Sequence, residues 1–222
     1  MIRLVVGLGN PGKEHERTRH NAGFWLVERF AQTSGFTLRK DPKFKALVGK
    51  NAGGAWFLLP QSYMNLSGQP VQMLAGFFKF KPEEILVVHD ELDFAPGVAR
   101  VKQGGGIAGH NGLRDISQRL GSHEYWRLRI GVGKPPAGTE GGDYVLQKPS
   151  ADDKAAIDQA IDRSLQVLPE MLTGDMQAAI QKLHSGEPRP VEKKEPAKKD
   201  VPVKEPEPQK SGGLLKSLFG KK

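Results

Sequence analysis

Hydrophobic residues recur along the first 185 positions with two alternating periods, one typical of strands and one typical of helices. Short apolar runs predict strands at residues 4–6, on both sides of a turn at 51–54 within residues 45–59, and at 85–88, 98–102 and 126–132. Apolar residues at helical spacing predict helices at residues 20–32, 67–78, 113–120, 152–168 and 175–183. Ser67 is the expected N-cap of the second of these helices. Strands that alternate with helices predict an α/β domain with a mixed sheet.

The composition changes after residue 186. Residues 187–210 consist almost wholly of Pro, Glu, Lys, Asp and Val, and residues 187–222 hold six of the chain's 16 prolines. Such a segment buries too little apolar surface to offset its ordering entropy, so it is expected to be disordered. Residues 214–219 (LLKSLF) end it with a short basic amphipathic patch. The sequence therefore predicts a domain at 1–186 and a tail at 187–222 that is either a solvated extension or a contact for a polyanionic partner such as an anionic membrane.

Charge and cysteine content limit the classes of function. The 222 residues carry a net charge of +8, and the chain has no cysteine, which excludes disulfides and Cys-ligated zinc. The charge favours a polyanionic partner such as nucleic acid, although many proteins carry as much without one. The N-terminal apolar run is too short for a signal peptide, and no stretch approaches the ~20 apolar residues of a membrane span. A soluble, cytoplasmic protein is expected.

Five polar segments that border predicted elements contain the candidate chemistry. They are GLGNPG at 7–12, TRHNAG at 18–23, QSYMNLSG at 61–68, HDELD at 89–93 and GGGIAGHNG at 104–112. The first satisfies the dinucleotide-binding pattern G-x-G-x-x-G, but no helix begins there and no acidic residue ends a second strand about 20 positions on. Each segment alone could be an ordinary turn, cap or solvated loop.

The residues alone are compatible with more than one kind of site. The carboxylates of HDELD, together with His20 or His110, could bind a divalent metal, or one carboxylate could orient a histidine base. The backbone N–H groups of residues 104–112, ahead of a helix, could receive an anion or an oxyanion. Five residues on loops at strand or helix ends suffice for hydrolysis without a Ser or Cys nucleophile: Asn10, His20, Asn65, Asp90 and Asn111.

In this order and spacing, the five motifs resemble those of the bacterial-type peptidyl-tRNA hydrolase family, over about residues 2–184. The resemblance implies a single α/β domain with a twisted mixed sheet surrounded by helices. It implies hydrolysis of the ester between peptide and tRNA in peptidyl-tRNAs released from the ribosome, by a monomer without metal or cofactor. The alternatives are a metal-dependent hydrolase that uses Asp90, Glu91 and Asp93, and a non-catalytic RNA-binding protein.

The resemblance also assigns roles to residues. His20 is implied to be the general base that activates water, Asp90 to hold its imidazole, and Asn10 to lie beside the scissile ester. The residues implied to bind substrate and tRNA are His15, Tyr63, Asn65, Asn111, Lys102 and Arg129. Among these, Lys102 and Arg129 look like the family's pair for the tRNA 5′-phosphate, and His15 departs from the tyrosine that the family usually carries.

Overall fold

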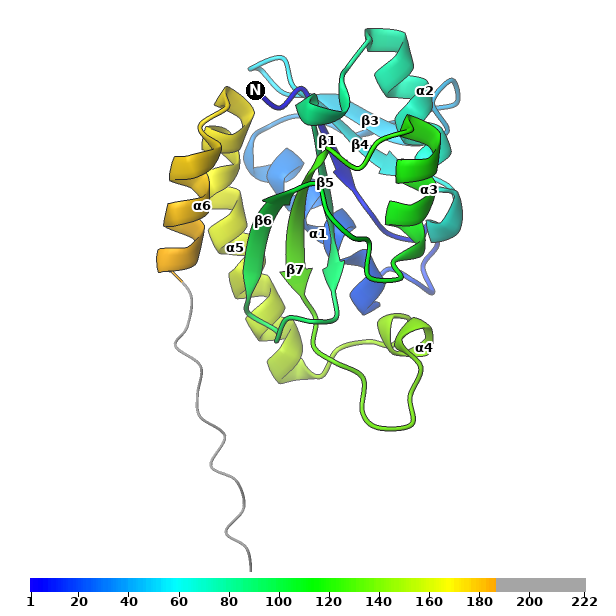
Figure 1. The fold of residues 1–222 in the computed structure, drawn as a ribbon, viewed down its shortest axis with the longest axis vertical. Helices are drawn as coiled ribbons and strands as arrows, with labels where there is room; N and C mark the ends of the chain where they lie inside the picture. The colour runs from blue at the N-terminus through cyan, green and yellow to red at the C-terminus, as the bar shows by residue number, and fades with distance from the viewer. Residues whose placement is uncertain (187–222) are drawn as a thin grey trace, which may run out of the picture. The chain divides into compact units, whose positions relative to one another are not determined.

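The computed structural model describes residues 1–186, whose strands form one seven-stranded sheet in the order β2-β3-β4-β1-β5-β7-β6 (Figure 1). Strands β4, β1, β5 and β7 run parallel, whereas β2, β3 and β6 pair antiparallel with their neighbours. The strands are β1 (Leu4–Gly7), β2 (Arg39–Asp41), β3 (Ala46–Lys50), β4 (Trp56–Pro60), β5 (Ile85–Glu91), β6 (Ala99–Gln103) and β7 (Trp126–Gly131).

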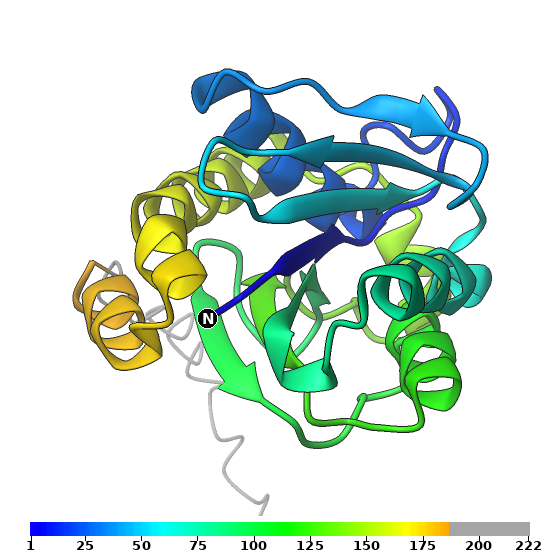
Figure 2. The ribbon, with the colours of Figure 1, turned by 90° about the horizontal axis from the view of Figure 1, so that it is seen from above.

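Helices cover both faces of this sheet (Figure 2). One core cluster joins one face of the central strands to α1, α5 and α6, and a second joins the opposite face to α2 and α3. The central strands are therefore apolar on both faces, which explains the continuous runs at β1 and β5. The helices are α1 (Ala22–Thr33), α2 (Gly68–Phe78), α3 (Asn111–Leu120), α4 (Gly141–Val145), α5 (Ala151–Thr173) and α6 (Met176–Ser185), with 3-10 turns η1 (Arg19–Asn21), η2 (Met64–Leu66) and η3 (Pro82–Glu84). The predicted single α/β domain with a twisted mixed sheet and surrounding helices is confirmed.

Several local predictions were wrong in detail. Strand β5 continues through His89, Asp90 and Glu91, so these residues are part of the sheet and not of a loop after it. Helix α5 continues through Pro169 because Leu168 and Met171 pack into the core. Ser67 does not cap α2 with its side chain, since its hydroxyl donates to the carbonyl of Met64.

Two elements were not predicted because their sequences show no strand or helix periodicity. Strand β2 is Arg-Lys-Asp, and it forms because it pairs with β3 at the sheet edge. Helix α4 is a short turn that contains two glycines.

The predictions of a disordered tail and an amphipathic end fall on residues 187–222, which lie outside the described part of the chain. Within residues 1–186, no helix combines the length and the apolar character needed to cross a membrane.

Candidate active site

Three of the predicted site segments lie at the ends of parallel strands. Asn10 lies three residues after β1, residues 61–67 follow β4, and Asp90 is near the end of β5. Parallel strands end at the same edge of the sheet, where open α/β folds place their ligands. The topology therefore brings together motifs that are up to 80 residues apart in sequence.

His20 is positioned by close packing between α1 and the two central strands. Its 3-10 turn leads directly into α1, where a Cβ on Gly23 would lie 2.3 Å from the Val88 carbonyl oxygen and 2.4 Å from the Leu8 nitrogen. Only glycine permits this approach. The backbone N–H of Phe24 also donates to the Leu8 carbonyl at 3.1 Å. The start of α1 is thus fixed against the sheet beside Asp90.

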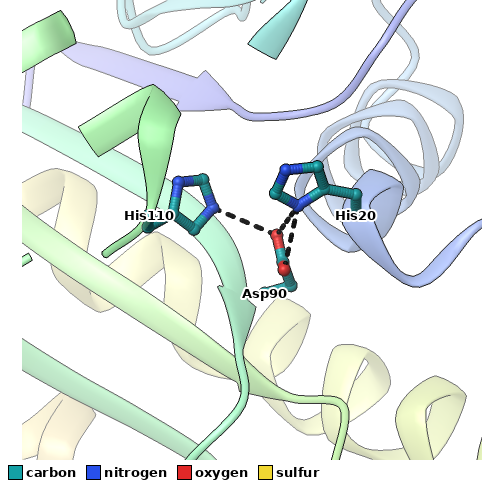
Figure 3. A group of neighbouring side chains, drawn as sticks. All are labelled: His20, Asp90 and His110. Atoms are coloured by element: carbon teal, nitrogen blue, oxygen red, sulfur yellow. Dashed lines mark hydrogen bonds and ion pairs between the residues drawn. The ribbon is translucent and has the colours of Figure 1, made fainter. Parts of the chain in front are cut away.

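Asp90 accepts hydrogen bonds from two histidines (Figure 3). His20 Nδ1 lies 2.9 and 3.0 Å from the two carboxylate oxygens, and His110 Nε2 lies 3.1 Å from Oδ1. All three side chains are nearly or fully buried, with 11%, 2% and 8% of the side chains of His20, Asp90 and His110 exposed. Three elements that are remote in sequence, η1, β5 and the start of α3, meet at this carboxylate.

The hydrogen bonds fix the tautomers of both rings. His110 Nδ1 accepts from the backbone N–H of Gly112 at 3.1 Å and of Leu113 at 3.4 Å. It therefore carries no proton, and Nε2 is the nitrogen that donates to Asp90. Since Asp90 has only acceptors when ionised, His20 donates from Nδ1, which leaves the lone pair of Nε2 available. Nε2 has no hydrogen bond within residues 1–186 and points away from Asp90.

Electrostatics favour an ionised Asp90 and a basic His20. Burial opposes the charge on Asp90, but His20 and His110 hold the pKa of its carboxyl well below its usual range. Burial alone would lower the pKa of His20, yet the Asp90 charge and hydrogen bond raise it above the ordinary 6.5. His20 is thus a stronger base than a free imidazole and accepts a proton at Nε2.

His89, which precedes Asp90, has a different environment. Full burial and the adjacent His110 lower the pKa of His89 to about 3, so its ring is neutral. Its Nδ1 lies 2.6 Å from the Asp90 carbonyl oxygen, and its ring packs edge-on against His110. His89 therefore supports His110 and is not available to transfer protons.

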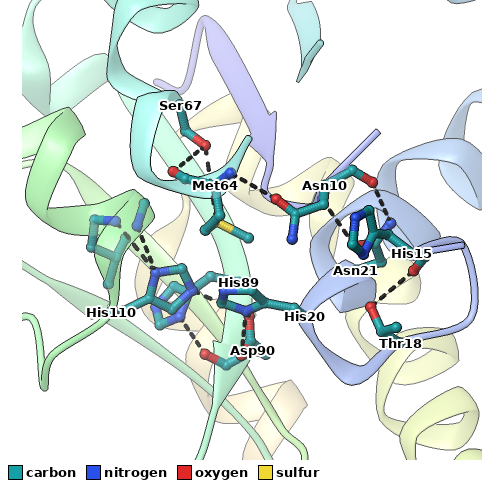
Figure 4. Close-up of polar contacts among 12 residues, drawn as sticks. Asn10, His15, Thr18, His20, Asn21, Met64, Ser67, His89, Asp90 and His110 are labelled. Carbon is teal, nitrogen blue, oxygen red and sulfur yellow. Dashed lines mark hydrogen bonds and ion pairs between the residues drawn. The ribbon is translucent and has the colours of Figure 1, made fainter. Parts of the chain in front are cut away.

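Three hydrogen bonds fix the backbone and the side chain of Asn10 (Figure 4). Its backbone N–H and C=O form reciprocal 2.9 Å hydrogen bonds with the side chain of Asn21, and its Oδ1 accepts from the Met64 backbone N–H at 2.7 Å. Because Oδ1 is occupied, the amide Nδ2 is the donor that Asn10 can offer to another molecule. Asn10 is buried, so this donor has a fixed direction.

A cavity of about 250 Å³ opens over the histidines and reaches Asn111. Asn111 is the first residue of α3, and its Oδ1 accepts from Arg114 at 3.2 Å, which again leaves Nδ2 as a donor. Asn65 lies on η2 beside Met64 and is exposed. His20, Asp90 and Asn111 therefore border one cavity, while Asn65 lies next to the residue that orients Asn10.

The carboxylates of HDELD do not converge on a common site. Glu91 contacts Arg129 at 3.7 Å and the Asp93 backbone N–H at 3.2 Å, while the Asp93 side chain is 67% exposed, near Lys134. Within residues 1–186, the group with metal-ligand spacing is His20, Asp90 and His110, whose ligand atoms lie within 4.8 Å of one another. The hypothesis of a metal held by three carboxylates was wrong, because alternate residues of β5 face opposite sides of the sheet.

Part of the glycine segment before α3 is already hydrogen-bonded within the protein. The N–H groups of Gly112 and Leu113 at the start of α3 donate to His110, which is the N-cap of that helix. They are therefore not free for an anion. The sequence marked His110 only as one possible metal ligand, and it gave no signal for Asn21 or for the Met64 backbone.

The residues implied to contact tRNA lie at two places. Tyr63 is 62% exposed, and the ring of His15 meets it edge-on at 6.4 Å between centroids. Lys102 on β6 and Arg129 on β7 lie at the opposite edge of the sheet from β2. Arg129 faces Arg100 across the two strands, and Lys102 faces Arg127.

Comparisons with known proteins agree with the motifs. The sequence model of the family described as peptidyl-tRNA hydrolase matches residues 4–194. Peptidyl-tRNA hydrolases of Leptothrix cholodnii and Thiobacillus denitrificans are 48% and 52% identical, over 94% and 82% of this chain and 99% and 90% of theirs. A crystal structure of peptidyl-tRNA hydrolase from Acinetobacter baumannii superposes with a TM-score of 0.81 at 44% identity, over 85% of this chain and 97% of that one.

Proposed function

This chain belongs to the peptidyl-tRNA hydrolase family, and from that membership we propose that it hydrolyses the ester between a peptide and tRNA with His20 as general base. The observation that carries this assignment is the orientation of His20. Asp90 binds its Nδ1–H, and its Nε2 is left as an acceptor beside the cavity.

The reaction follows from this geometry. Nε2 of His20 accepts a proton from a water molecule while the water oxygen attacks the ester carbonyl carbon. The imidazolium that forms is stabilised by the ionised Asp90. When the tetrahedral intermediate collapses, the C–O bond to the ribose breaks, and the leaving ribose oxygen takes the proton back from His20. General-base assistance of this kind contributes about 10²–10⁴-fold to a rate.

Amide groups are suited to the rest of the substrate. Asn10 Nδ2 is directed by the Met64 N–H bond and would lie beside the scissile ester, while Asn65 and Asn111 would hold the peptide backbone and the attacking water. A free aminoacyl ester presents an ammonium group where a peptidyl ester presents an amide. Amides oriented for that amide would leave the ammonium poorly solvated, which favours the peptidyl substrate.

The tautomers argue for chemistry without a metal. A metal at His110 Nε2 needs the lone pair of that nitrogen, and a neutral ring would then carry its proton on Nδ1. That proton would face the backbone N–H groups of Gly112 and Leu113, at 3.1 and 3.4 Å. When His110 instead carries its proton on Nε2 and donates it to Asp90, its Nδ1 accepts from both backbone N–H groups.

Other parts of the proposal concern partners and location. His15 and Tyr63 would contact tRNA through their rings, and Lys102 and Arg129 through its phosphates, which bind without reading sequence. We propose that the protein acts as a monomer in the cytoplasm.

The test uses N-acetyl-aminoacyl-tRNA and free aminoacyl-tRNA as paired substrates, each with and without EDTA. Wild-type protein is expected to release tRNA from the blocked substrate, to leave the free one intact, and to ignore EDTA. Loss of cleavage in EDTA would indicate that His20, Asp90 and His110 bind a metal ion. Tight tRNA binding with neither substrate cleaved would support the alternative of a non-catalytic RNA-binding protein.

A further inference from the structure

Helix α4 forms one side of the cavity that His20 borders. Its residues Gly141, Gly142 and Val145 line that cavity, together with residues of β5 and of the segment before α3. A helix of five residues with two glycines is too short and too flexible to be stable alone, and a loop at residues 132–140 separates α4 from β7 (Figure 1). Contacts with the rest of the domain must therefore hold this side of the cavity in place.

Arg19 hydrogen-bonds the backbone that follows α4. Its backbone N–H donates to the Gln147 carbonyl at 3.1 Å, and its Nη1 donates to the carbonyls of Gln147 and Lys148 at 3.3 and 2.9 Å. The charge of the guanidinium makes such hydrogen bonds stronger than neutral ones, and positive charge is favourable next to a helix C-terminus. Arg19 thus holds the C-terminal end of α4.

Two further groups fix the guanidinium of Arg19. It lies over the ring of Tyr144, with 4.1 Å between Cζ and the ring centroid, and its Nη2 is 3.2 Å from Asp153 at the start of α5. The hydroxyl of Tyr144 donates to the Val132 carbonyl at 3.2 Å, at the beginning of the loop before α4. Only 7% of the Arg19 side chain is exposed. The two ends of the segment from Val132 to Lys148 are therefore joined through Arg19 and Tyr144.

Arg19 also belongs to the 3-10 turn that contains the proposed base. It immediately precedes His20 in η1, and the packing of α1 against the central strands fixes the position of that turn. The His20 ring is directed toward Asp90, while the Arg19 side chain contacts residues of α4 and α5. Neighbouring residues of one turn thus hold the base and one side of the cavity.

We propose that Arg19 is a positioning residue for the substrate, because it holds α4 in a fixed place relative to His20 and so maintains the shape of the cavity. This inference rests on the proposed function for its substrate, a peptidyl-tRNA ester. The Arg19 side chain is buried against Tyr144 and the backbone after α4, so it acts on the substrate through α4. Its loss should weaken substrate binding more than it slows proton transfer at His20.

The test compares kcat and KM for N-acetyl-aminoacyl-tRNA in wild type, Arg19→Ala and Arg19→Lys. Arg19→Ala is expected to raise KM about tenfold, which corresponds to α4 in its binding position for about a tenth of the time. kcat should fall by less, and the midpoint of the pH profile of kcat/KM should not move, because Asp90 still contacts His20. Lysine keeps the charge but offers a single nitrogen, so Arg19→Lys should raise KM by a smaller factor.

Hydrogen exchange measures the stability of α4 independently of catalysis. The backbone N–H of Tyr144 donates to the Glu140 carbonyl at 3.0 Å, and that of Gln147 donates to the Tyr144 carbonyl at 3.1 Å. Both N–H groups should exchange faster in Arg19→Ala than in wild type, because exchange reports local opening.

Arg29→Ala is the matched control that separates positioning from stability. Arg29 on α1 binds Asp158 and Asp162 of α5, each at 2.7 Å, and none of these three residues lines the cavity. Its loss should affect at most the melting temperature, and should leave KM and the exchange of α4 at their wild-type values.

The proposal is supported if Arg19→Ala raises KM about tenfold with faster exchange of α4, and Arg29→Ala changes neither. A folded Arg19→Ala with the KM of Arg29→Ala refutes it, whether or not α4 exchanges faster. A shifted pH midpoint also refutes it, because Arg19 would then act on His20 itself. If Arg19→Ala does not fold, a KM of Arg19→Lys above that of wild type supports the proposal, and a wild-type KM refutes it. Failure of wild type to cleave peptidyl-tRNA would refute the proposed function instead, and would leave the exchange result standing.

Discussion

Replacing Asp90 by asparagine should shift the pH dependence of catalysis as well as reduce its rate. His20 Nδ1 lies 2.9 and 3.0 Å from the two Asp90 oxygens, and this charge is what raises the pKa of His20 against its burial. An opposite charge at this distance shifts a pKa by about 1–3 units. Without it, burial dominates, and the pKa of His20 falls below 6.5. The asparagine nitrogen would also face one of the two histidine N–H groups, which favours the wrong tautomer.

The sign of the pH effect follows from the role of His20 as a base. Only unprotonated His20 accepts a proton from water, so kcat/KM rises with pH through the pKa of His20 in the free enzyme. In wild type this rise is expected above pH 6.5, since the pKa is raised. In Asp90→Asn it is expected below pH 6.5, with a plateau lower by about 10²–10⁴-fold.

The assay is release of tRNA from N-acetyl-aminoacyl-tRNA between pH 5 and 9, with Asp93→Asn as the matched control. Asp93 is three residues away, and its carboxylate is 67% exposed, so the same substitution there should leave the profile unchanged. If Asp90→Asn keeps the wild-type plateau, or if its rise stays above pH 6.5, Asp90 does not set the basicity of His20.

Three further predictions concern residues around the catalytic pair. His110→Ala should reduce kcat and also destabilise the protein by about 0.5–2 kcal/mol in urea unfolding, because it loses the N-cap acceptor of α3 and a donor to Asp90; unchanged stability would show that the cap contributes little. Asn21→Ala should destabilise by about 1–3 kcal/mol, since it leaves the buried backbone N–H and C=O of Asn10 without partners; a stability equal to wild type would refute that function for the pair. Asn10→Ala should lower the ratio of kcat/KM for N-acetyl-aminoacyl-tRNA to kcat/KM for aminoacyl-tRNA. An equal fall in kcat/KM for both substrates would show that Asn10 does not discriminate between them.

The sequence predicts the parts of the fold that depend on hydrophobic period. The strands at β1, β4, β5 and β7 and the five longer helices follow from runs of apolar residues that must be buried. Strand β2 could not be predicted, because Arg39–Asp41 has no apolar residue and forms through its ladder with β3. The ends of β5 and α5 were misplaced since polar residues and a proline are accommodated there by packing against other elements.

Some residues of the candidate site could likewise be predicted from the sequence, whereas the function of others required the fold. His20, Asp90 and Asn10 stand in motifs whose order resembles a known family, and the structure brings His20 and Asp90 into contact. The function of His110 required the fold, because its two nitrogens are defined by Asp90 of another strand and by the backbone of its own helix. The function of Asn21 likewise depends on its contacts with Asn10, which no periodicity in the sequence relates to it.

General-base catalysis by His20 is tested most directly by single-turnover hydrolysis of N-acetyl-aminoacyl-tRNA by His20→Ala. The rate should fall by about 10²–10⁴-fold or more, while the affinity for tRNA stays close to that of wild type. A folded His20→Ala protein that cleaves within a few-fold of the wild-type rate would contradict the function of His20 as the base.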